Sequence, residues 1–214
     1  MPYGYVGDIS TKIKQSKKNN GVLTVNEIAA LETDGSWGGS LEHIETQTIT
    51  SDTSQVDFDD IKESKYAVHR LDIINAVSDT DNKDFSLRVS VGGTFDTDAD
   101  YHRALYSLTA NGNEEESYVT TASQMDITRN SGSATNEKTN ARIYIYNAGN
   151  SAKYTFNTNQ STYINNDGYY KSTIGGGMYD QTGIVDGFRI FMDGSGDIAS
   201  GVFKLYGMKQ IWVT

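Results

Sequence analysis

The stretch 85–91, Phe-Ser-Leu-Arg-Val-Ser-Val, alternates strictly between apolar and polar residues. Successive side chains of a β-strand point to opposite faces of the sheet. We therefore expect Phe85, Leu87, Val89 and Val91 to enter a hydrophobic core, while the polar row meets water. The same alternation recurs at residues 141–146 and 203–207. This period of two indicates β-structure over the larger part of the chain.

Further strands are expected wherever short apolar or aromatic runs lie between turn-rich clusters. The clusters are built from Gly, Asn, Asp and Ser, which favour tight turns, and we assign Gly175–Gly177 to a sheet connection of this kind. No helical period separates the runs, so the pattern predicts an all-β, antiparallel β-sandwich over residues 41–214. The additional strands are expected at residues 45–51, 66–77, 102–108, 117–121, 125–128, 153–156, 187–192 and 210–213.

Residues 1–40 differ from the rest and predict a short N-terminal extension with one small helix. Thr24 and Glu27 fit a capping box, and Ile28 and Leu31 supply an apolar strip of about two turns. Such a short helix is marginal by itself. Trp37 follows, and two interpretations remain open: the indole folds back onto the helix, or it anchors in a neighbouring subunit, since Trp is enriched at interface hot spots.

Four lysines, Lys12, Lys14, Lys17 and Lys18, make this extension basic. They form either a solvated tail or a cationic arm that lies on an acidic partner. We expect a docking segment over residues 1–40, in which these lysines meet acidic groups of the partner and the apolar residues supply most of the affinity. The predicted docking residues are Lys12, Lys14, Lys17, Lys18, Ile28, Leu31 and Trp37.

Composition excludes several classes of protein. The net charge of −10 and a pI near 4.7 disfavour binding to nucleic acid or to an anionic membrane. No run approaches the roughly 18 apolar residues of a membrane span, and we expect no membrane insertion. The absence of cysteine removes disulfides, thiolate metal sites and cysteine nucleophiles.

The residues that could carry chemistry form no recognised catalytic or metal pattern. His43, His69 and His102 have no partner at a known metal spacing, and His102 is interpreted as a structural hydrogen-bonding residue. Acidic clusters occur within residues 57–60, 96–100 and 193–197, but we interpret them as solvated turns rather than Ca²⁺ loops. We therefore predict no enzymatic activity, no metal and no cofactor.

The C-terminal part carries a resemblance to a known group of proteins. Gly187–Phe191, then Gly194–Gly201, then Phe203–Lys209 resemble the closing strands of a jelly-roll-like domain common in virion proteins of tailed bacteriophages. Earlier segments follow the same template in order, so that the match spans about residues 45–209. Residues 21–37 are similar to the opening of fibre or appendage proteins of cyanophage-like viruses. Here the folded body follows almost at once, which favours a short appendage over a long fibre.

This resemblance implies a structural component of the virion, made in the host cytoplasm. It implies a short tail or neck appendage or fibre-type protein, assembled as a homotrimer, docked on other virion proteins of the tail, neck or capsid, and able to contact a host-surface glycan. A head (capsid) decoration protein is the nearest alternative. A carbohydrate-binding module would need exposed aromatic side chains that converge on one sheet face or loop cluster. A glycan-cleaving enzyme would need a pair of carboxylates in a cleft.

Overall fold

The computed structural model describes Asn26 and residues 40–208, and the strands lie within the second of these parts. Backbone contacts divide the chain into two units, Met1–Ser40 and Leu41–Thr214, and every described strand belongs to the second unit. In chain order the strands are β1 (Leu41–Ile49), β2 (Gln55–Phe58), β3 (Val68–Ser78), β4 (Phe85–Val91), β5 (Thr94–Phe95), β6 (Tyr101–Thr109), β7 (Glu114–Ala122), β8 (Met125–Asp126), β9 (Thr139–Tyr146), β10 (Thr155–Ile164), β11 (Tyr170–Tyr179), β12 (Val185–Met192) and β13 (Ile198–Met208).

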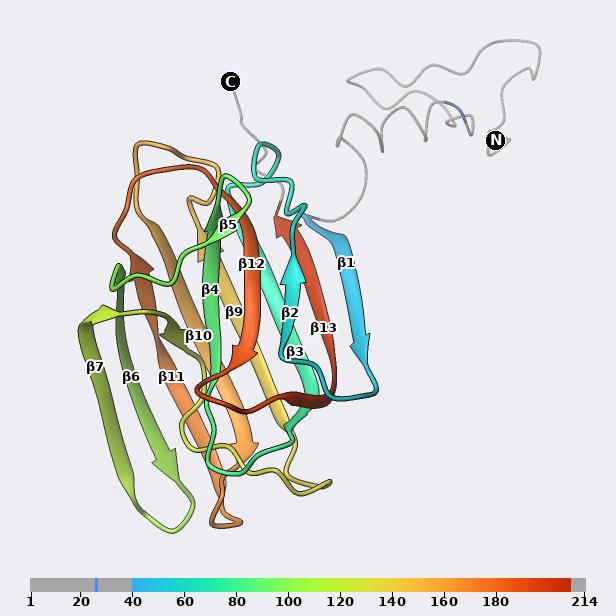
Figure 1. Cartoon of the computed structure of the whole chain (residues 1–214), viewed down its shortest axis with the longest axis vertical. Helices are drawn as coiled ribbons and strands as arrows, with labels where there is room; N and C mark the ends of the chain where they lie inside the picture. Colours follow the sequence, from blue (N-terminus) through green and yellow to red (C-terminus); the bar gives the residue numbers. More distant parts are fainter. Residues whose placement is uncertain (1–25, 27–39, 209–214) are drawn as a thin grey trace, which may run out of the picture. The chain divides into compact units, whose positions relative to one another are not determined.

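The strands form two antiparallel sheets that pack face to face. The large sheet has the order β1-β13-β3-β9-β10-β11-β6-β7, and the small sheet has the order β2-β12-β4-β5, with β8 also paired to β4. Figure 1 shows β2, β12 and β4 of the small sheet in front of the large one. The predicted all-β antiparallel sandwich is therefore confirmed.

As in a jelly roll, strands from the early and the late part of the chain pair with each other in both sheets, and further strands are added to the large sheet. The pair β3–β13 lies in the large sheet and the pair β4–β12 in the small one, so the chain passes between the sheets both early and late. The meander β9-β10-β11 and the hairpin β6-β7 then widen the large sheet on one side. An eight-stranded jelly roll lacks this extension. The added strands β6 and β7 extend the large sheet past the edge of the small sheet (Figure 1).

The core lies between the sheets and is built from the alternating apolar rows. Phe85, Leu87 and Val89 of β4 are fully buried, as are Phe203 and Leu205 of β13. They belong to one continuous cluster that also includes side chains of β3, β9 and β12. The predicted inward direction of Phe203 and Leu205 is confirmed.

Two local expectations are wrong. The polar row of β4 does not meet water, because Ser86 is fully buried and donates a hydrogen bond to Asp126 Oδ1 at 3.1 Å. Gly175–Gly177 form no connection but the middle of β11, between β10 and β6. A Cβ on Gly176 would lie 2.2 Å from the carbonyl oxygen of Asn157, so the neighbouring backbone approaches too closely for any side chain.

The end of the chain also differs in detail from the expectation. Residues 194–201, which are rich in Gly and Ser, combine a turn with the start of the last strand, because β13 already begins at Ile198. Gly201 lies inside β13, where the register towards β3 shifts between Ser200 and Val202. The small residues of this region therefore serve both a turn and a strand irregularity. The strand expected at residues 210–213 lies outside the described residues. Of the helix expected in the extension, the structure describes one residue, Asn26, which is helical.

Candidate functional site

The widened part of the large sheet presents its outer face, the face turned away from the small sheet. Directly opposite residues of antiparallel neighbours share one face of a sheet. One row across five strands runs Tyr144 (β9), Thr158 (β10), Gly176 (β11), Ala104 (β6) and Tyr118 (β7). Its three middle members are small and its two ends are tyrosines. The row therefore forms the floor of a depression that crosses the strands.

Larger side chains in the two adjacent rows wall this depression. On one side Phe156 lies opposite Met178, and Met178 lies opposite His102; on the other Gln160 lies opposite Ile174. The resulting hollow has a volume of about 660 Å³ towards β7, and a second of about 300 Å³ adjoins it towards β9. We call these two together the transverse groove. It is lined by His102, Ala104, Tyr118, Phe156, Gly176 and Met178, and by Arg142, Tyr144, Thr158, Gln160 and Ile174.

Several large apolar side chains are exposed around the groove. Tyr118 is 79% exposed, Ile174 51% and Phe156 42%, and Tyr106 and Leu108 on the same face are also exposed. Contiguous exposed apolar surface on a folded protein commonly marks a binding surface. The convergence of exposed aromatic residues on one sheet face, which a carbohydrate-binding module requires, is thus present in this part of the chain.

A third hollow, of about 580 Å³, continues along the outer face over β3, β9, β10 and β11. Arg142, Gln160 and Ile174 line both this hollow and the groove. Asp72 is the one acid among the described residues that line any of the three, and its Oδ1 lies 3.3 Å from Arg142 Nε. Glycoside hydrolysis usually needs two carboxylates that flank the scissile bond. Among the described residues, these three hollows therefore lack the pair of carboxylates that this chemistry usually uses.

The three histidines do not come together. His43 is exposed on β1, where Nε2 lies 2.7 Å from Thr46 Oγ1, and His102 on β6 has Nε2 3.0 Å from Asp180 Oδ2. His69 on β3 is fully buried, its Nε2 lies 2.8 Å from the carbonyl oxygen of Ile61, and burial lowers its pKa to about 4. Each ring has a separate local partner.

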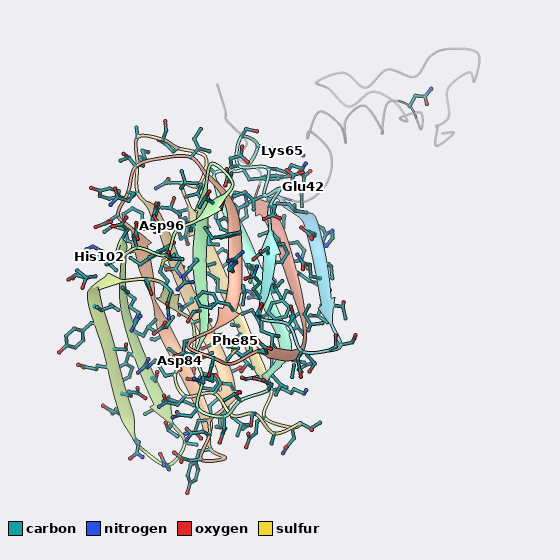
Figure 2. All side chains as sticks on the ribbon, viewed as in Figure 1. Glu42, Lys65, Asp84, Phe85, Asp96 and His102 are labelled. Carbon is teal, nitrogen blue, oxygen red and sulfur yellow. The ribbon has the colours of Figure 1, made fainter. Side chains whose placement is uncertain are left out.

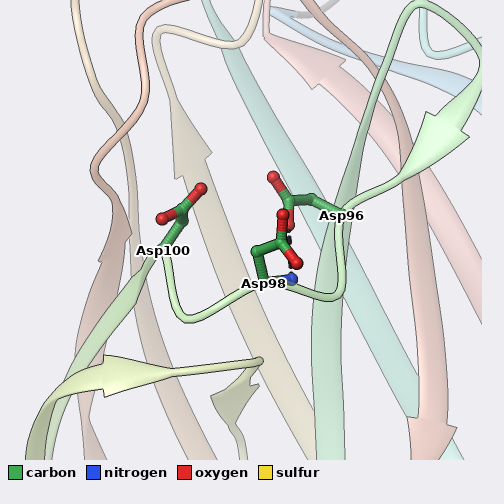
Figure 3. Close-up of side chains that lie close together, drawn as sticks. All are labelled: Asp96, Asp98 and Asp100. Atoms are coloured by element: carbon green, nitrogen blue, oxygen red, sulfur yellow. Dashed lines mark hydrogen bonds between the residues drawn. The ribbon is translucent and has the colours of Figure 1, made fainter.

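The loop between β5 and β6 gathers three carboxylates. Asp96, Asp98 and Asp100 each offer an oxygen within 4.8 Å of the others (Figure 3). Asp96 Oδ1 accepts a hydrogen bond of 2.7 Å from the backbone N–H of Asp98, and Asp96 Oδ2 accepts one of 2.7 Å from the Tyr179 hydroxyl. Desolvation and the neighbouring carboxylates raise the pKa of Asp100. Carboxylate oxygens are ligands that Ca²⁺ prefers, and these three are the described residues that could hold such an ion.

The other two acidic clusters are engaged in local structure. Asp57 accepts two hydrogen bonds from Arg189, both at 2.7 Å, and Asp60 forms an ion pair with Lys62. Asp193 Oδ1 accepts a hydrogen bond of 2.8 Å from the backbone N–H of Asp84. These contacts fit the interpretation of both clusters as structural turns.

A cluster of charged residues inside the sandwich was not expected from the sequence. Arg129 contacts Asp84 at 2.6 Å, Glu115 at 3.1 Å and Asp126 at 3.4 Å through its guanidinium nitrogens. Lys171 lies 2.6 Å from Glu115, and Arg103 lies 3.0 Å from Asp126. We call these six residues the interior ion cluster. It joins β6, β7 and β11 of the large sheet to the loop that follows β8.

Burial dominates the electrostatics of this cluster. Asp84 is 5% exposed, and desolvation raises its pKa to about 7 although the Arg129 guanidinium and the N–H of Asn130 both favour the carboxylate. Burial also raises the pKa of Asp126. Burial acts in the same direction on Glu115, yet the hydrogen bonds from Lys171 and Arg129 hold its pKa below the ordinary value. Asp84 and Asp96 lie towards opposite ends of the sandwich (Figure 2), so this cluster is separate from the acidic loop.

No protein-family model matches the chain, and no curated protein matches it.

The likeness to phage virion proteins therefore rests on the residues quoted for it. The predicted docking residues Lys12, Lys14, Lys17, Lys18, Ile28, Leu31 and Trp37 all lie outside the described residues. Within residues 40–208 the structure contains no helix with the length and apolarity that a membrane crossing requires. The transverse groove is the strongest candidate site in the described part of the chain.

Proposed function

We propose that the chain is a structural, non-enzymatic component of a tailed-phage virion. In this proposal it is a short tail or neck appendage or fibre-type protein, residues 1–40 dock it on the particle, and the sandwich is displayed for contact with the host surface. The ordered resemblance over residues 45–209 supports the virion assignment, and the all-β sandwich agrees with the fold that the resemblance implies.

The observation that carries the display role is the open outer face of the large sheet. Tyr118, Phe156 and Ile174 are exposed on it, around a hollow of about 660 Å³. Exposing apolar side chains to water is unfavourable, so a surface patch of this kind is explained most simply by a ligand that covers it. By contrast, the buried carboxylates of the interior ion cluster each contact a cation, so they serve the packing of the sandwich.

The virion assignment is tested by asking whether the chain is part of the particle. Particles from cells infected with a virus that encodes this chain would be purified through two density gradients and labelled with an antibody against residues 41–208. We expect the antibody to mark one defined location on each particle. Particles that carry no detectable copy of the chain would contradict the proposal.

The docking role of residues 1–40 is tested on particles assembled without the chain, to which purified protein is added. A variant with Lys12, Lys14, Lys17 and Lys18 changed to Gln should attach more weakly, because the cationic side chains no longer meet acidic groups of the partner. The matched control changes Lys62, Lys138, Lys153 and Lys204 of the sandwich to Gln, which removes the same charge. Equal attachment of both variants would show that the four lysines of the extension take no specific part in docking.

A further inference from the structure

We infer that the transverse groove binds a neutral oligosaccharide, which lies across the strands and stacks sugar rings on Tyr118 and Phe156. This inference names the ligand class of the host-contact face, and so its biological meaning rests on the proposed function. Its physical basis is independent of where the chain is located.

The shape of the groove favours a thin, elongated ligand. Its floor runs from Tyr144 on β9 to Tyr118 on β7, across four inter-strand steps. With strands about 4.8 Å apart, the floor is roughly 19 Å long. Gly176 cannot carry a side chain without displacing the backbone of β10, and Ala104 beside it carries only a methyl group. The low floor is thus built into the backbone arrangement at Gly176 and Ala104, and the side chains of the two adjacent rows form its walls.

The lining combines apolar platforms with hydrogen-bonding groups. A pyranose ring has an apolar face of C–H groups and a rim of hydroxyls, so it needs both kinds of surface. Tyr118 and Phe156 offer exposed aromatic rings. Within residues 40–208, the amide of Gln160 and the hydroxyl of Tyr118 make no hydrogen bond, which leaves them free to bind ligand hydroxyls. A mostly apolar site with a few polar groups is the usual composition of a ligand pocket.

The charge distribution favours a neutral glycan over an acidic one. Arg103 and Arg142 are the arginines that line the groove. Arg103 Nε lies 3.0 Å from Asp126 Oδ2, and Arg142 Nε lies 3.3 Å from Asp72 Oδ1, a carboxylate that Arg70 also contacts. Glu116 lies opposite Tyr106 at the β7 edge of the same face, and the chain has a net charge of −10. At the β7 end of the groove an anionic glycan would meet repulsion from Glu116, and both arginines that line the groove already contact a carboxylate.

A second copy of the chain is a weaker candidate for the occupant. Next to the groove the outer face carries Arg70, Asp72, Arg142 and Lys204 on β3, β9 and β13, and charged residues are depleted in the cores of protein interfaces. A flat partner surface would also leave the hollow of about 660 Å³ unfilled. A peptide that adds a strand would pair at a sheet edge, whereas the groove crosses the middle of the strands.

The test uses the full-length protein and isothermal titration with defined probes: cellohexaose, laminarihexaose and mannohexaose as neutral glycans, and a galacturonic acid hexamer as the acidic one. We expect at least one neutral probe to bind and the acidic probe not to bind. Tyr118→Ala should weaken that binding at least tenfold, because a stacking platform is lost. Ala104→Arg should abolish it by filling the floor of the groove.

Two control variants separate the groove from general effects. Thr48→Arg places the same side chain on the outer face at the far strand β1, and Tyr169→Ala removes an exposed tyrosine from the β10–β11 turn. Both should bind as the unmodified protein does, and circular dichroism should show all four variants folded. The inference is overturned if no neutral probe binds, if only the acidic probe binds, or if Tyr118→Ala and Ala104→Arg bind normally.

Analytical ultracentrifugation tests the alternative that a second copy of the chain, and not a glycan, covers the groove. If Ala104→Arg dissociates an oligomer that Thr48→Arg leaves intact, the face is an interface between copies and the glycan inference is wrong. Failure of glycan binding by a chain that is found on particles would refute the groove inference alone. Glycan binding by a chain that is missing from particles would refute the virion assignment alone.

Discussion

Arg129 holds the interior ion cluster together, since one guanidinium contacts three carboxylates. Arg129→Gln removes this cation. Asp126 then keeps its contact with Arg103, and Glu115 keeps Lys171. Asp84 loses its one ion-pair partner among the described residues. Its side chain is buried, because the residue is 5% exposed in the unmodified protein. The variant therefore leaves a buried carboxylate without a compensating charge.

The expected loss of stability follows from this arrangement. Breaking a buried ion pair by removal of one partner costs about 3–5 kcal/mol. Because two of the three carboxylates keep another cation, we expect the lower end, about 3 kcal/mol at pH 8. The pKa of Asp84 is about 7 with Arg129 present and rises further without it, so at pH 5 Asp84 is protonated. Ionisation of a carboxyl group with a pKa of about 7 is worth about 1.4 kcal/mol at pH 8, so the loss should then fall by up to about 1.4 kcal/mol, to about 1.6 kcal/mol.

Urea denaturation followed by circular dichroism, at pH 8 and at pH 5, measures both values. The control is Arg142→Gln, whose side chain is 52% exposed beside Asp72, and which should cost less than about 1 kcal/mol at either pH. A loss below about 1 kcal/mol for Arg129→Gln at pH 8 would refute the reasoning. So would a loss that is equal at the two pH values.

Three further predictions concern the core, the titration of Asp84 and the acidic loop. Leu205→Ala should lower the free energy of unfolding by about 2–5 kcal/mol in urea denaturation, because the side chain is fully buried; a loss under about 0.5 kcal/mol would contradict the packing. The folded-state pKa of Asp84, about 7, lies above its ordinary 3.8, so Asp84 makes the free energy of unfolding rise as the pH falls from about 8 to about 5. Asp84→Asn should remove this part of the rise, and an unchanged pH profile would show that another group causes it. Ca²⁺ should leave the Tm unchanged; a Ca²⁺-dependent rise that Asp98→Asn abolishes would instead assign a metal site to the loop.

The sequence predicts a strand well where one inward row is apolar. β4 spans the expected residues 85–91, because Phe85, Leu87 and Val89 stand out against their polar neighbours. β10 was expected only at residues 153–156 but continues to Ile164. Its buried row contains Asn157 and Asn159, so the apolar alternation on which the prediction depends is missing. A strand such as β10, whose buried row is polar, is therefore not predicted from hydrophobic periodicity.

β11 was missed for a related reason. Glycine lowers strand propensity, and three consecutive glycines are typical of a connection. In the structure the close approach of β10 to Gly176 requires a residue without a side chain, and this requirement comes from a strand far away in the sequence. Local sequence carries no information about such a contact.

The candidate site was predicted only as a possibility. The sequence contains fourteen tyrosines, and residue identity alone does not distinguish a tyrosine of a contact surface from one that covers a wet sheet face. The groove depends on the register of Tyr144, Thr158, Gly176, Ala104 and Tyr118, which come from five strands. Strand order and register arise from the tertiary fold. The interior ion cluster was missed for the same reason, as its six members are brought together from five separate segments.

The location and orientation of the sandwich on the particle test the central claim most directly. A whole-particle electron cryomicroscopy reconstruction, into which residues 41–208 are fitted, would measure both. We predict density for the sandwich at one location on the tail or neck, with the face that carries Tyr118 and Phe156 turned to solvent. A particle without this density, or one in which that face is packed against another virion protein, would contradict the account.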